Sequence, residues 1–494
     1  MQEKAHRALL AEAHASLREG RFDDAQSQAD RLLAQGGDRG EVCEILGQVA
    51  AARGDIPGAA AWMTEASDLL PKALNVAFQA SHFNHLAGNF DAALELIDRA
   101  LALSPLNPTL FYARGLALGA LGRHEEEIAS YRKAIEIKDD FVDAYVNMGV
   151  ALRDMRRFDD ALAAFKTAIG LNPEHAGART NRAQTNLILG NFEHGWRDYE
   201  WRWFDGRQQH GVLGKRWDGN LAALRGKVLL IHAEQGLGDT IQFVRYVQRF
   251  AGSGVDVVLR VPQTLVSLLD GFPGTTTVMS DSAPLPSYDF HVPLLSLPAA
   301  LYRTFPQIPG DIPYLKADPG LAQAWNYRLD ERGIDKNRKR VGLVWSTERN
   351  LGTEQDLRKT DLSQWLSLFE LDCQFVSLQK VVPDADGAIL RETKAVWDPS
   401  ALLDTMADTA ALISQLDLVI AIDTSVVHVA GALGLPLWIA LVDKSDWRWG
   451  LNREDSVWYP TARLFREERP GDMQGAIARI RSELAGFIGQ HNRL

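Results

Sequence analysis

The apolar positions of the first two hundred residues recur with a period of 34. One column of this alignment is mainly apolar and holds Phe22, Ile56, Phe90, His124, Phe158 and Phe192. A second column holds only small residues, namely Ala13, Gly47, Ser81, Gly115, Gly149 and Ala183. A third holds Ala66, Ala100, Ala134 and Ala168, and a fourth holds Pro71, Pro105 and Pro173, with Asp139 in the remaining proline slot. A fixed period without insertions predicts a stack of similar helical units.

These columns resemble the tetratricopeptide repeat, whose helix–turn–helix unit has this length and these small, apolar and proline positions. The resemblance implies a helical solenoid over residues 1–195, with about five and a half repeats. Glu127 and Gly195 stand where the pattern expects a small alanine, so we predict a less regular fourth unit and a modified sixth one. Arrays of this kind usually bind protein, and a spacer or dimerisation role is the alternative. Candidate contact residues are Asn75, Asn147 and Asn181.

Residues 196–225 lose the period and are rich in aromatic side chains. Tryptophan contributes a large buried area, so this segment is expected to pack between domains rather than to hold a ligand. We interpret it as a junction between the solenoid and the C-terminal part of the chain. Its tryptophans are Trp196, Trp201, Trp203 and Trp217.

From residue 226 the pattern changes to short apolar runs that alternate with amphipathic segments, which predicts an α/β fold. The first half, residues 226–320, is expected to place a strand over 227–234, a loop with the sequence QGLGDT, a helix from Ile241 and a strand over 255–261. A proline-rich stretch then leads out of this half.

The second α/β half is predicted over residues 340–470, with a final helix over 471–494. Apolar runs predict strands over 340–346 and 373–380, and a helix is expected over 408–415. Two α/β halves joined in this way would face each other across a crevice.

The strongest strand–turn–helix signal of the chain is LVIAIDTSVVHVAGALGLPLW, residues 418–438. Leu418–Ile422 reads as a buried parallel strand, and Val426–Leu433 reads as a helix closed by Gly434. A helix that starts at the carboxyl end of a strand points free N–H groups at the crevice, which suits a phosphate. Asp423, Thr424 and Ser425 would lie there, and the alternative is that they only cap the helix.

Further polar residues follow the predicted strands of the second half. Ser346 ends one strand, and Gln379 and Lys380 end another. Arg358 and Lys359 lie in the polar loop between these strands, and with Lys380 they are the cations able to neutralise a diphosphate.

His428 lies one turn into the predicted helix, where it could donate to a phosphate or leaving group, or pack against Asp423. Asp384 and Asp386 have the spacing of a metal-binding DxD motif. We expect them in a loop beyond their strand and interpret the spacing as chance, so no metal site is predicted.

Gly236 and Gly238 are similar to the start of a dinucleotide fingerprint, but Ile241 stands at its third position and Arg260 ends the next strand. A nicotinamide site is therefore not expected. The glycines would instead let an acceptor or a diphosphate approach the backbone. Asp239 is either an N-terminal cap or a general base, and Glu234 is the next candidate for the base.

The 494 residues carry a formal net charge of −11, which disfavours a sequence-independent nucleic-acid surface. No apolar run approaches the roughly 18 residues of a membrane span, and the start of the chain lacks a signal-peptide apolar region. We therefore expect a cytoplasmic protein.

The two cysteines, Cys43 and Cys373, are expected to be reduced.

Several segments together resemble bacterial proteins that join tetratricopeptide repeats to a glycosyltransferase of GT-B fold. They are EQGLGDTIQF, GLVWS, FVSLQK, the stretch from residue 408 to 438, DWRW and WYPTARLF. The catalytic half is similar to lipopolysaccharide heptosyltransferases, the domain order is like that of protein O-GlcNAc transferases, and flagellin glycosyltransferases share the layout.

The resemblance implies two Rossmann-like halves that hold a nucleotide sugar, an inverting reaction, and no metal or cofactor beyond this substrate. It puts the base on Asp239, the phosphate-binding helix start on Thr424 and Ser425, and a phosphate-binding lysine near Lys359. The implied activity is transfer of a sugar to a protein acceptor recruited by the repeats, with flagellin as the suggested acceptor. The alternatives are a non-catalytic scaffold with a degenerate GT-B domain, and a glycolipid or lipopolysaccharide glycosyltransferase.

Overall fold

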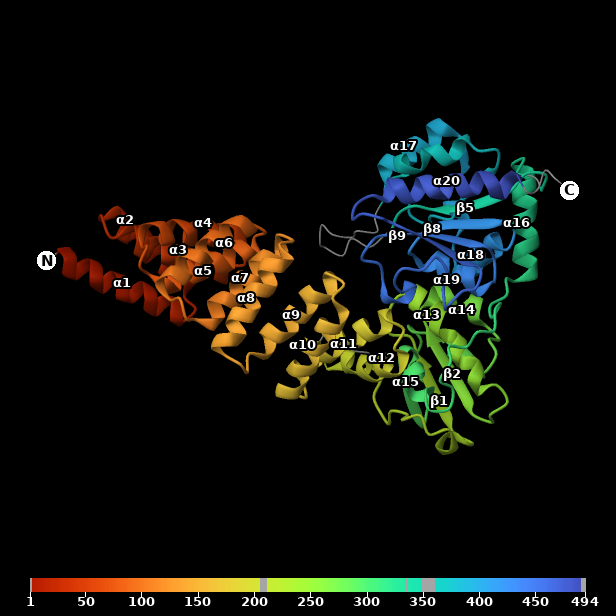
Figure 1. Cartoon of the computed structure of the whole chain (residues 1–494), viewed down its shortest axis with the longest axis horizontal. Helices are drawn as coiled ribbons and strands as arrows, with labels where there is room; N and C mark the ends of the chain where they lie inside the picture. The colour runs from red at the N-terminus through yellow and green to blue at the C-terminus, as the bar shows by residue number, and fades with distance from the viewer. Residues whose placement is uncertain (1, 205–210, 335, 348–359, 490–494) are drawn as a thin grey trace. The chain divides into compact units, whose positions relative to one another are not determined.

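The computed structural model describes residues 2–204, 211–334, 336–347 and 360–489. The chain divides into two compact units, Met1–Thr185 and Asn186–Leu494, which are called unit 1 and unit 2 below. In Figure 1 the colour runs from red through orange and yellow along unit 1, and through green to blue along unit 2.

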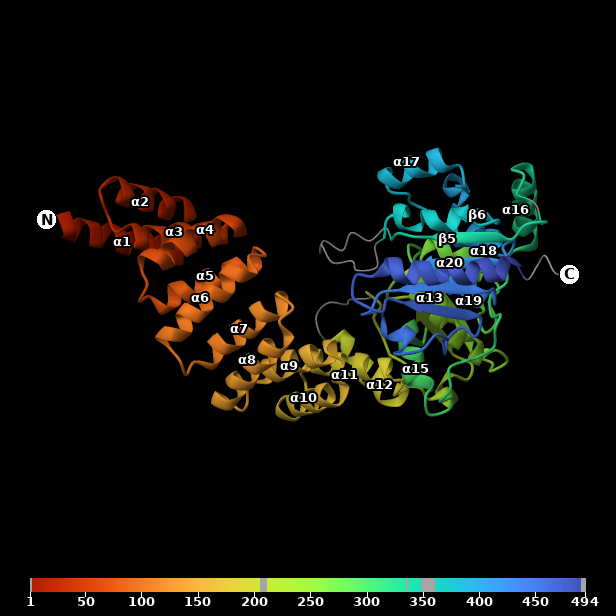
Figure 2. The same cartoon turned by 45° about the horizontal axis from the view of Figure 1, so that its top comes forward.

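Unit 1 is built from consecutive helices that pack in pairs (Figures 1 and 2). Its helices are α1 (Gln2–Arg18), α2 (Phe22–Ala34), α3 (Arg39–Ala52), α4 (Ile56–Leu69), α5 (Leu74–Leu86), α6 (Phe90–Leu103), α7 (Pro108–Ala120), α8 (His124–Ile137), α9 (Val142–Asp154) and α10 (Phe158–Leu171). Helix α11 (Ala176–Ile188) crosses the boundary between the units, and α12 (Phe192–Tyr199) lies in unit 2. Every residue of the mainly apolar column is the first residue of an even-numbered helix, so the predicted period is that of the helix pairs.

Small residues allow the paired helices to approach closely. A Cβ atom on Gly115 would lie 2.3 Å from the ring of Tyr131, and one on Gly149 would lie 2.5 Å from the ring of Phe165. Glu127, at the irregular position of the fourth unit, is buried against Gly119, and its carboxylate lies 2.9 Å from His124 Nδ1.

The three candidate asparagines bond to neighbouring helices of the array. Asn147 donates to the Tyr112 hydroxyl at 2.8 Å, Asn181 accepts from Arg153 at 3.0 Å, and Asn75 donates to Glu44 at 3.4 Å. Their role in binding an acceptor stays a prediction.

The turn inside each helix pair contains a residue with positive φ. Five of these turns use glycine, at Gly20, Gly54, Gly88, Gly122 and Gly190. In the fifth repeat the same position is Arg156, with φ of 60°. A side chain with a Cβ atom is strained in this left-handed region, whereas glycine is not.

Replacing Arg156 by glycine should therefore stabilise unit 1 by on the order of 0.5–1 kcal/mol, since relief of strain exceeds the added freedom of the unfolded chain. Thermal unfolding followed by circular dichroism should show a rise in Tm of about 1–4 °C. The matched control is Arg132→Gly inside α8, which should lower the stability by about 1 kcal/mol. A similar loss in both variants would mean that the turn at Arg156 is not strained.

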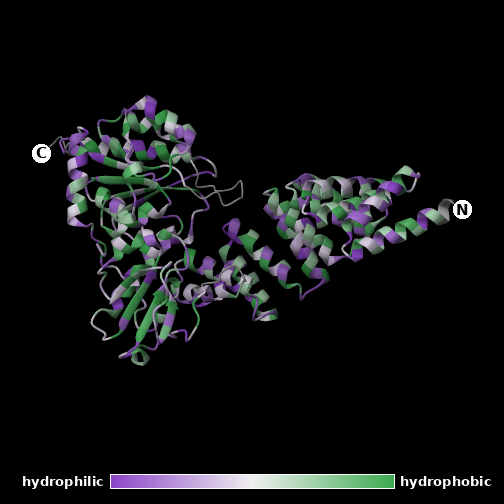
Figure 3. Ribbon diagram, turned by 180° about the vertical axis from the view of Figure 1, so that it is seen from behind, coloured by the Kyte–Doolittle hydropathy of each residue, from purple (hydrophilic) through white to green (hydrophobic). Residues whose placement is uncertain are grey.

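Unit 2 contains two fully parallel sheets. The first sheet has the order β3-β2-β1-β4 and the second has the order β10-β9-β8-β5-β6-β7. The strands are β1 (Val228–His232), β2 (Asp256–Val261), β3 (Thr277–Ser280), β4 (Phe290–Pro293), β5 (Arg340–Val344), β6 (Gln374–Ser377), β7 (Val396–Trp397), β8 (Leu418–Ile422), β9 (Leu437–Leu441) and β10 (Ala462–Arg466). Most of these strands are apolar, as the green ribbons of Figure 3 show, because helices cover the sheets.

After α12, the α-helices of unit 2 lie between the strands or follow the last of them. They are α13 (Leu237–Phe243), α14 (Gln263–Leu269), α15 (Leu297–Leu301), α16 (Pro319–Glu331), α17 (Asp384–Thr393), α18 (Met406–Ile413), α19 (Ser425–Ala432) and α20 (Met473–Gly489). The 3₁₀ helices are η1 (Glu200–Trp203), η2 (Leu221–Leu224), η3 (Val244–Phe250), η4 (Leu294–Ser296), η5 (Leu362–Glu370), η6 (Ser400–Leu402) and η7 (Trp447–Trp449). Helices α13 and α14 of the first half contact α19 and α18 of the second half, which lie directly above them in Figure 1.

Two local predictions in unit 2 are wrong. Most of the expected loop QGLGDT belongs to α13, which begins at Leu237 because the Asp239 carboxylate caps the backbone N–H of Gly236 at 2.9 Å. Asp384 and Asp386 lie in the first turn of α17 rather than in a loop. Asp386 is buried and accepts from the Trp345 indole at 2.8 Å and from the backbone of Leu362 at 3.1 Å.

The aromatic side chains of α12 and of the segment after it pack within unit 2. The Trp196 ring contacts Phe243 of the first half at 5.7 Å between centroids, and Trp447 and Trp458 of the second half at 5.4 and 6.4 Å. Trp217 is also buried, against Phe250. This aromatic core holds the two halves together.

Among the described residues, no helix combines the length and apolar character that crossing a membrane requires. Cys43 of unit 1 and Cys373 of unit 2 are both buried free thiols.

Candidate functional site

A cavity of 580 Å³ lies in unit 2, where the carboxyl end of β5 and the carboxyl end of β8 meet the loop after β1. In the second sheet, β6 and β7 extend to one side of β5, and β8, β9 and β10 extend to its other side. The strand order therefore reverses between β5 and β8. Ligands of open α/β sheets bind at such a switch point.

The cavity brings together residues from both halves that the sequence singled out. From the first half they are Gly236, Gly238 and Asp239, and from the second half they are Ser346, Gln379, Lys380, Asp423, Thr424, Ser425 and His428. Arg358 and Lys359 lie outside the described residues.

Two hydroxyl groups in this cavity lack partners. Thr424 is the N-cap residue of α19, but its side chain makes no capping hydrogen bond. Its Oγ1 atom and the Oγ atom of Ser346, a residue only 2% exposed, are buried without a hydrogen-bond partner among the described residues. Buried polar groups are normally bonded, so two unpaired hydroxyls among the residues that line one cavity are unusual. The Thr424 side chain therefore does not cap the helix, although Thr424 is its N-cap residue.

Two helices begin at the cavity. The N-terminus of α19 lies beside Thr424 and Ser425, and the N-terminus of α18 lies beside Thr405 and Met406. The Thr405 side chain and Asp408 form a reciprocal cap, which explains why α18 starts two residues before the predicted helix. Both helices contribute positive dipole ends to the same space.

Gln379 positions Ser346 rather than pointing free groups at a ligand. Its side-chain oxygen accepts from the Ser346 N–H at 3.2 Å, and its amide nitrogen donates to the Ser346 carbonyl at 3.0 Å. Lys380 lies at the edge of the cavity with 53% of its side chain exposed, and its ammonium donates to the Ser400 carbonyl at 3.3 Å. Lys380 remains able to turn toward an anion.

Asp239 faces a cation that the sequence analysis did not single out. Arg448 lines the cavity, pairs with Asp239 and, at 2.8 Å, with Asp446, and donates to Gln242 at 2.6 Å. Burial lowers the pKa of Arg448, but the carboxylates of Asp446 and Asp239 raise it more, so the net shift is upward. Asp239 is therefore both a cap and one partner of a partly buried ion pair that joins the two halves.

The one sequence signal for Arg448 is the segment DWRW, which is unusually rich in tryptophan and lies close to the end of β9. Sequence periodicity carries no information about this segment, because its residues belong neither to a strand nor to an amphipathic helix. The ion pair with Asp239 is visible only in three dimensions.

His428 bonds to Tyr459 and not to Asp423. The His428 Nδ1 atom lies 2.9 Å from the Tyr459 hydroxyl, and the imidazole stacks on Trp449 with centroids 5.8 Å apart. Burial, together with the charges of Arg448 and Arg245, lowers the pKa of His428 well below its usual value. This shift favours the neutral imidazole.

Glu234 does not line the cavity, so the structure removes it as an alternative base. Its side chain is 1% exposed and pairs with Arg202 at 2.8 Å, and it accepts from the backbone of Leu295 at 2.9 Å. These contacts fix the junction to the first half.

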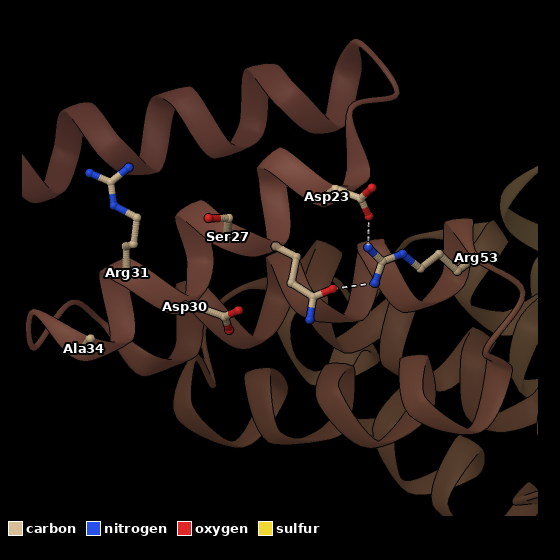
Figure 4. Close-up of a pocket in the computed structure, with 7 residues that line it drawn as sticks. Asp23, Ser27, Asp30, Arg31, Ala34 and Arg53 are labelled. Atoms are coloured by element: carbon tan, nitrogen blue, oxygen red, sulfur yellow. Dashed lines mark hydrogen bonds and ion pairs between the residues drawn. The ribbon is translucent and has the colours of Figure 1, made fainter.

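Unit 1 has a shallow depression of 430 Å³ beside α2, shown in Figure 4. Arg53 enters it from the C-terminal end of α3 and bonds to both Asp23 and Gln26. Most of the residues that line it are exposed, and Arg53 at its edge is already paired with Asp23, so the described residues there do not form a built ligand site.

Comparison with known proteins supports the interpretation of the helical part. Residues 10–73 and 87–140, and separately residues 142–175, match sequence models described as tetratricopeptide repeat. The first part of the chain is an array of tetratricopeptide repeats. Solved structures that are similar to part of this chain include MamA, with 24% identity and a TM-score of 0.31 over 33% of this chain and 96% of that one. Another is YrrB, with 20% identity and a TM-score of 0.29 over 35% of this chain and 88% of that one.

A relative that extends beyond the repeats is Protein FlbA of Caulobacter vibrioides. It is 27% identical over 424 residues, which cover 80% of this chain and 70% of FlbA. Since unit 1 ends at Thr185, a match of this length must reach well into unit 2.

Shorter matches include proteins named as glycosyltransferases. The UDP-N-acetylglucosamine–peptide N-acetylglucosaminyltransferase of Giardia intestinalis is 31% identical over 100 residues, 20% of this chain and 7% of that protein. The human protein O-mannosyl-transferase TMTC1 is 30% identical over 104 residues, 20% of this chain and 12% of that protein. The chain spans only a small part of these two relatives.

Proposed function

We propose that this protein is a glycosyltransferase of GT-B type that moves a sugar from a nucleotide donor to a protein acceptor. The observation that carries the proposal is the pair of unbonded hydroxyls, Ser346 and Thr424, in a cavity at the switch point of the second sheet. Together with the N-termini of α18 and α19, they offer donors and positive dipole ends to a phosphate.

The two halves supply different parts of the chemistry. Departure of a nucleotide requires donors that stabilise negative charge on its phosphate, and the second half provides Ser346, Thr424 and Ser425 for this purpose. Attack by an acceptor hydroxyl requires a base on the other side of the sugar, and the first half provides Asp239. No metal or cofactor takes part in the proposed reaction, whose stereochemical outcome is inversion.

The acceptor is a protein in this proposal because the repeats form an extended surface of the kind that binds protein segments. Two relatives that match about 100 residues of this chain are named as glycosyltransferases that act on proteins or peptides. We propose flagellin as the acceptor and the cytoplasm as the place of reaction, on the resemblance to flagellin glycosyltransferases.

A thermal-shift panel of UDP, GDP, CMP and ADP tests the donor site. One nucleotide at 100 times its Kd should stabilise the protein by about 2.7 kcal/mol, which is a rise in Tm of roughly 5 °C or more. The variant Thr424→Val should bind this nucleotide about 5- to 100-fold more weakly, since it loses one hydrogen bond to a charged group.

The control is Thr461→Val, which removes another buried and unpaired hydroxyl that lies outside the cavity. This variant should bind the nucleotide like the wild type. If no nucleotide raises Tm, or if both variants behave alike, the donor site is not where we place it and a scaffold role becomes the better explanation.

A further inference from the structure

Behind the cavity wall lies a chain of buried polar side chains that the proposed reaction does not use directly. Arg245 donates to the Tyr314 hydroxyl at 3.0 Å, the Tyr314 hydroxyl lies 3.5 Å from that of Tyr459, and Tyr459 contacts His428. Arg245 and Tyr459 are fully buried, and His428 is 4% exposed. Only His428 of this group borders the cavity.

The directions of the Tyr314 and Tyr459 hydroxyl hydrogens follow from the acceptors within reach. Tyr314 donates its own hydrogen to the carbonyl of Ile241 at 3.0 Å, so it has none left for Tyr459. Tyr459 then has two acceptors to choose from, His428 Nδ1 at 2.9 Å and the Tyr314 oxygen at 3.5 Å. The shorter contact is within normal hydrogen-bond distance, whereas the longer one is at its limit. The Tyr459 hydrogen therefore points at His428 Nδ1.

A neutral imidazole has one N–H hydrogen, which is on either Nδ1 or Nε2. The Nδ1 atom can accept from Tyr459 only if this hydrogen is on Nε2. The Nε2 edge of the ring faces Gly238, since a Cβ atom placed there would lie 2.7 Å from His428 Cδ2 and 3.3 Å from Nε2. Gly238 leaves this edge uncovered beside the start of α19. An N–H group of fixed direction thus faces the cavity close to Ser425.

We propose that Tyr459 is a positioning residue that holds His428 in the Nε2–H form, so that His428 serves as an uncharged hydrogen-bond donor to the leaving-group phosphate. The identity of the ligand rests on the proposed function, whereas the arrangement of hydrogens does not. A neutral imidazole is a poor source of a proton, so His428 stabilises charge on the departing phosphate by a hydrogen bond and does not transfer a proton to it.

The charged and titratable groups around the ring favour the same state. The positive charges of Arg448 and Arg245 oppose a further positive charge on the imidazole. Burial, as the largest cause, and the neighbouring Tyr314 raise the pKa of Tyr459 well above its usual value, so Tyr459 keeps its hydrogen. His428 should not change its charge in the range where histidine usually titrates.

The test is a long-range ¹H–¹⁵N correlation spectrum of the full-length protein with ¹⁵N-labelled histidine, in which His428→Gln identifies the His428 signals. Between about pH 6 and pH 8, the expected spectrum shows hydrogen on Nε2, none on Nδ1, and no titration. In Tyr459→Phe the preference is lost and both tautomers, or the charged form, appear. In Tyr314→Phe, the matched control on the same wall, the wild-type pattern remains.

Hydrogen on Nδ1 in the wild type, or a Tyr459→Phe spectrum identical to that of the wild type, would overturn the inference. If Tyr459→Phe does not fold, the wild-type and Tyr314→Phe spectra still decide the tautomer. Adding the nucleotide that raises Tm in the thermal-shift panel should change the ¹⁵N chemical shift of His428 Nε2. A nucleotide that binds without moving it refutes the donor role of His428, whereas absence of any nucleotide binding refutes the proposed function and leaves the tautomer result intact.

Kinetics provide a second measurement. Tyr459→Phe should lower kcat about 10-fold with little change in the KM for the donor, because the lost orientation matters most as charge develops on the phosphate. The kcat of Tyr459→Phe should also depend on pH between about pH 6 and pH 8 through titration of His428, a dependence that the wild type lacks. A purely structural role of Tyr459 would change stability without creating this dependence.

Discussion

The variant Asp239→Asn should transfer sugar about 10²- to 10⁴-fold more slowly than the wild type, with nearly unchanged donor affinity. Asparagine can still accept from the Gly236 N–H, but it cannot accept a proton from an acceptor hydroxyl. Its amide would also face the guanidinium of Arg448 without the ion pair. We therefore expect a loss of stability of about 1–3 kcal/mol in addition to the loss of rate. Transfer rate and Tm should be measured on the same protein.

The variant Arg448→Met separates the two effects. It removes the ion pair but keeps the carboxylate of Asp239, so a true base should leave it much more active than Asp239→Asn. If the carboxylate serves only to anchor Arg448, the two variants should lose activity equally, and the double variant should be no worse than either one. Equal losses would therefore falsify the catalytic assignment of Asp239.

Removal of residues 1–185 should leave nucleotide binding within a few-fold of the wild type but lower transfer to the acceptor protein by about 10²-fold or more. The physical reason is that the repeats hold the acceptor near the site and so raise its effective concentration. A shortened chain that starts at Asn186 keeps α12 and the aromatic core of unit 2. Nucleotide titration and transfer to purified flagellin are the two measurements.

A chain that starts at Trp196 is the matched comparison. It lacks Phe192, whose ring stacks on Trp196 at 6.2 Å and contacts Trp458 at 6.1 Å. We expect this shorter form to have a lower Tm than the form that starts at Asn186. A full transfer rate by either shortened chain would show that the repeats do not recruit the acceptor.

The repeats could be predicted in detail because each unit needs an apolar residue and a small residue at the same two positions. The column from Phe22 to Phe192 marks the first residue of every even-numbered helix from α2 to α12, and the glycines of the small column lie where a neighbouring side chain leaves no room for a Cβ atom. The strand of residues 418–422 was also predictable, since a buried parallel strand is a continuous apolar run.

The site was predicted only in part. The ends of parallel strands gather at one edge of a sheet, so Ser346 and Thr424 could be expected to lie together. Contacts between the halves could not be expected, because Arg448, Tyr459 and Tyr314 lie in stretches without periodicity. They reach Asp239 and His428 only after the two sheets have packed. Helix starts were misjudged where a carboxylate three residues inside the helix caps it, as Asp239 does in α13.

The burial of both native thiols makes the protein convenient for spectroscopic labelling. Burial raises the pKa of Cys43 to about 11 and that of Cys373 to about 12, so neither is a thiolate at neutral pH. Maleimide dyes should therefore spare them in the folded protein. Thr264 and Asp404 are exposed residues on opposite halves at the edge of the cavity. Cysteines introduced there could carry a fluorescent pair on the otherwise unaltered chain and report whether the cavity narrows when a nucleotide binds.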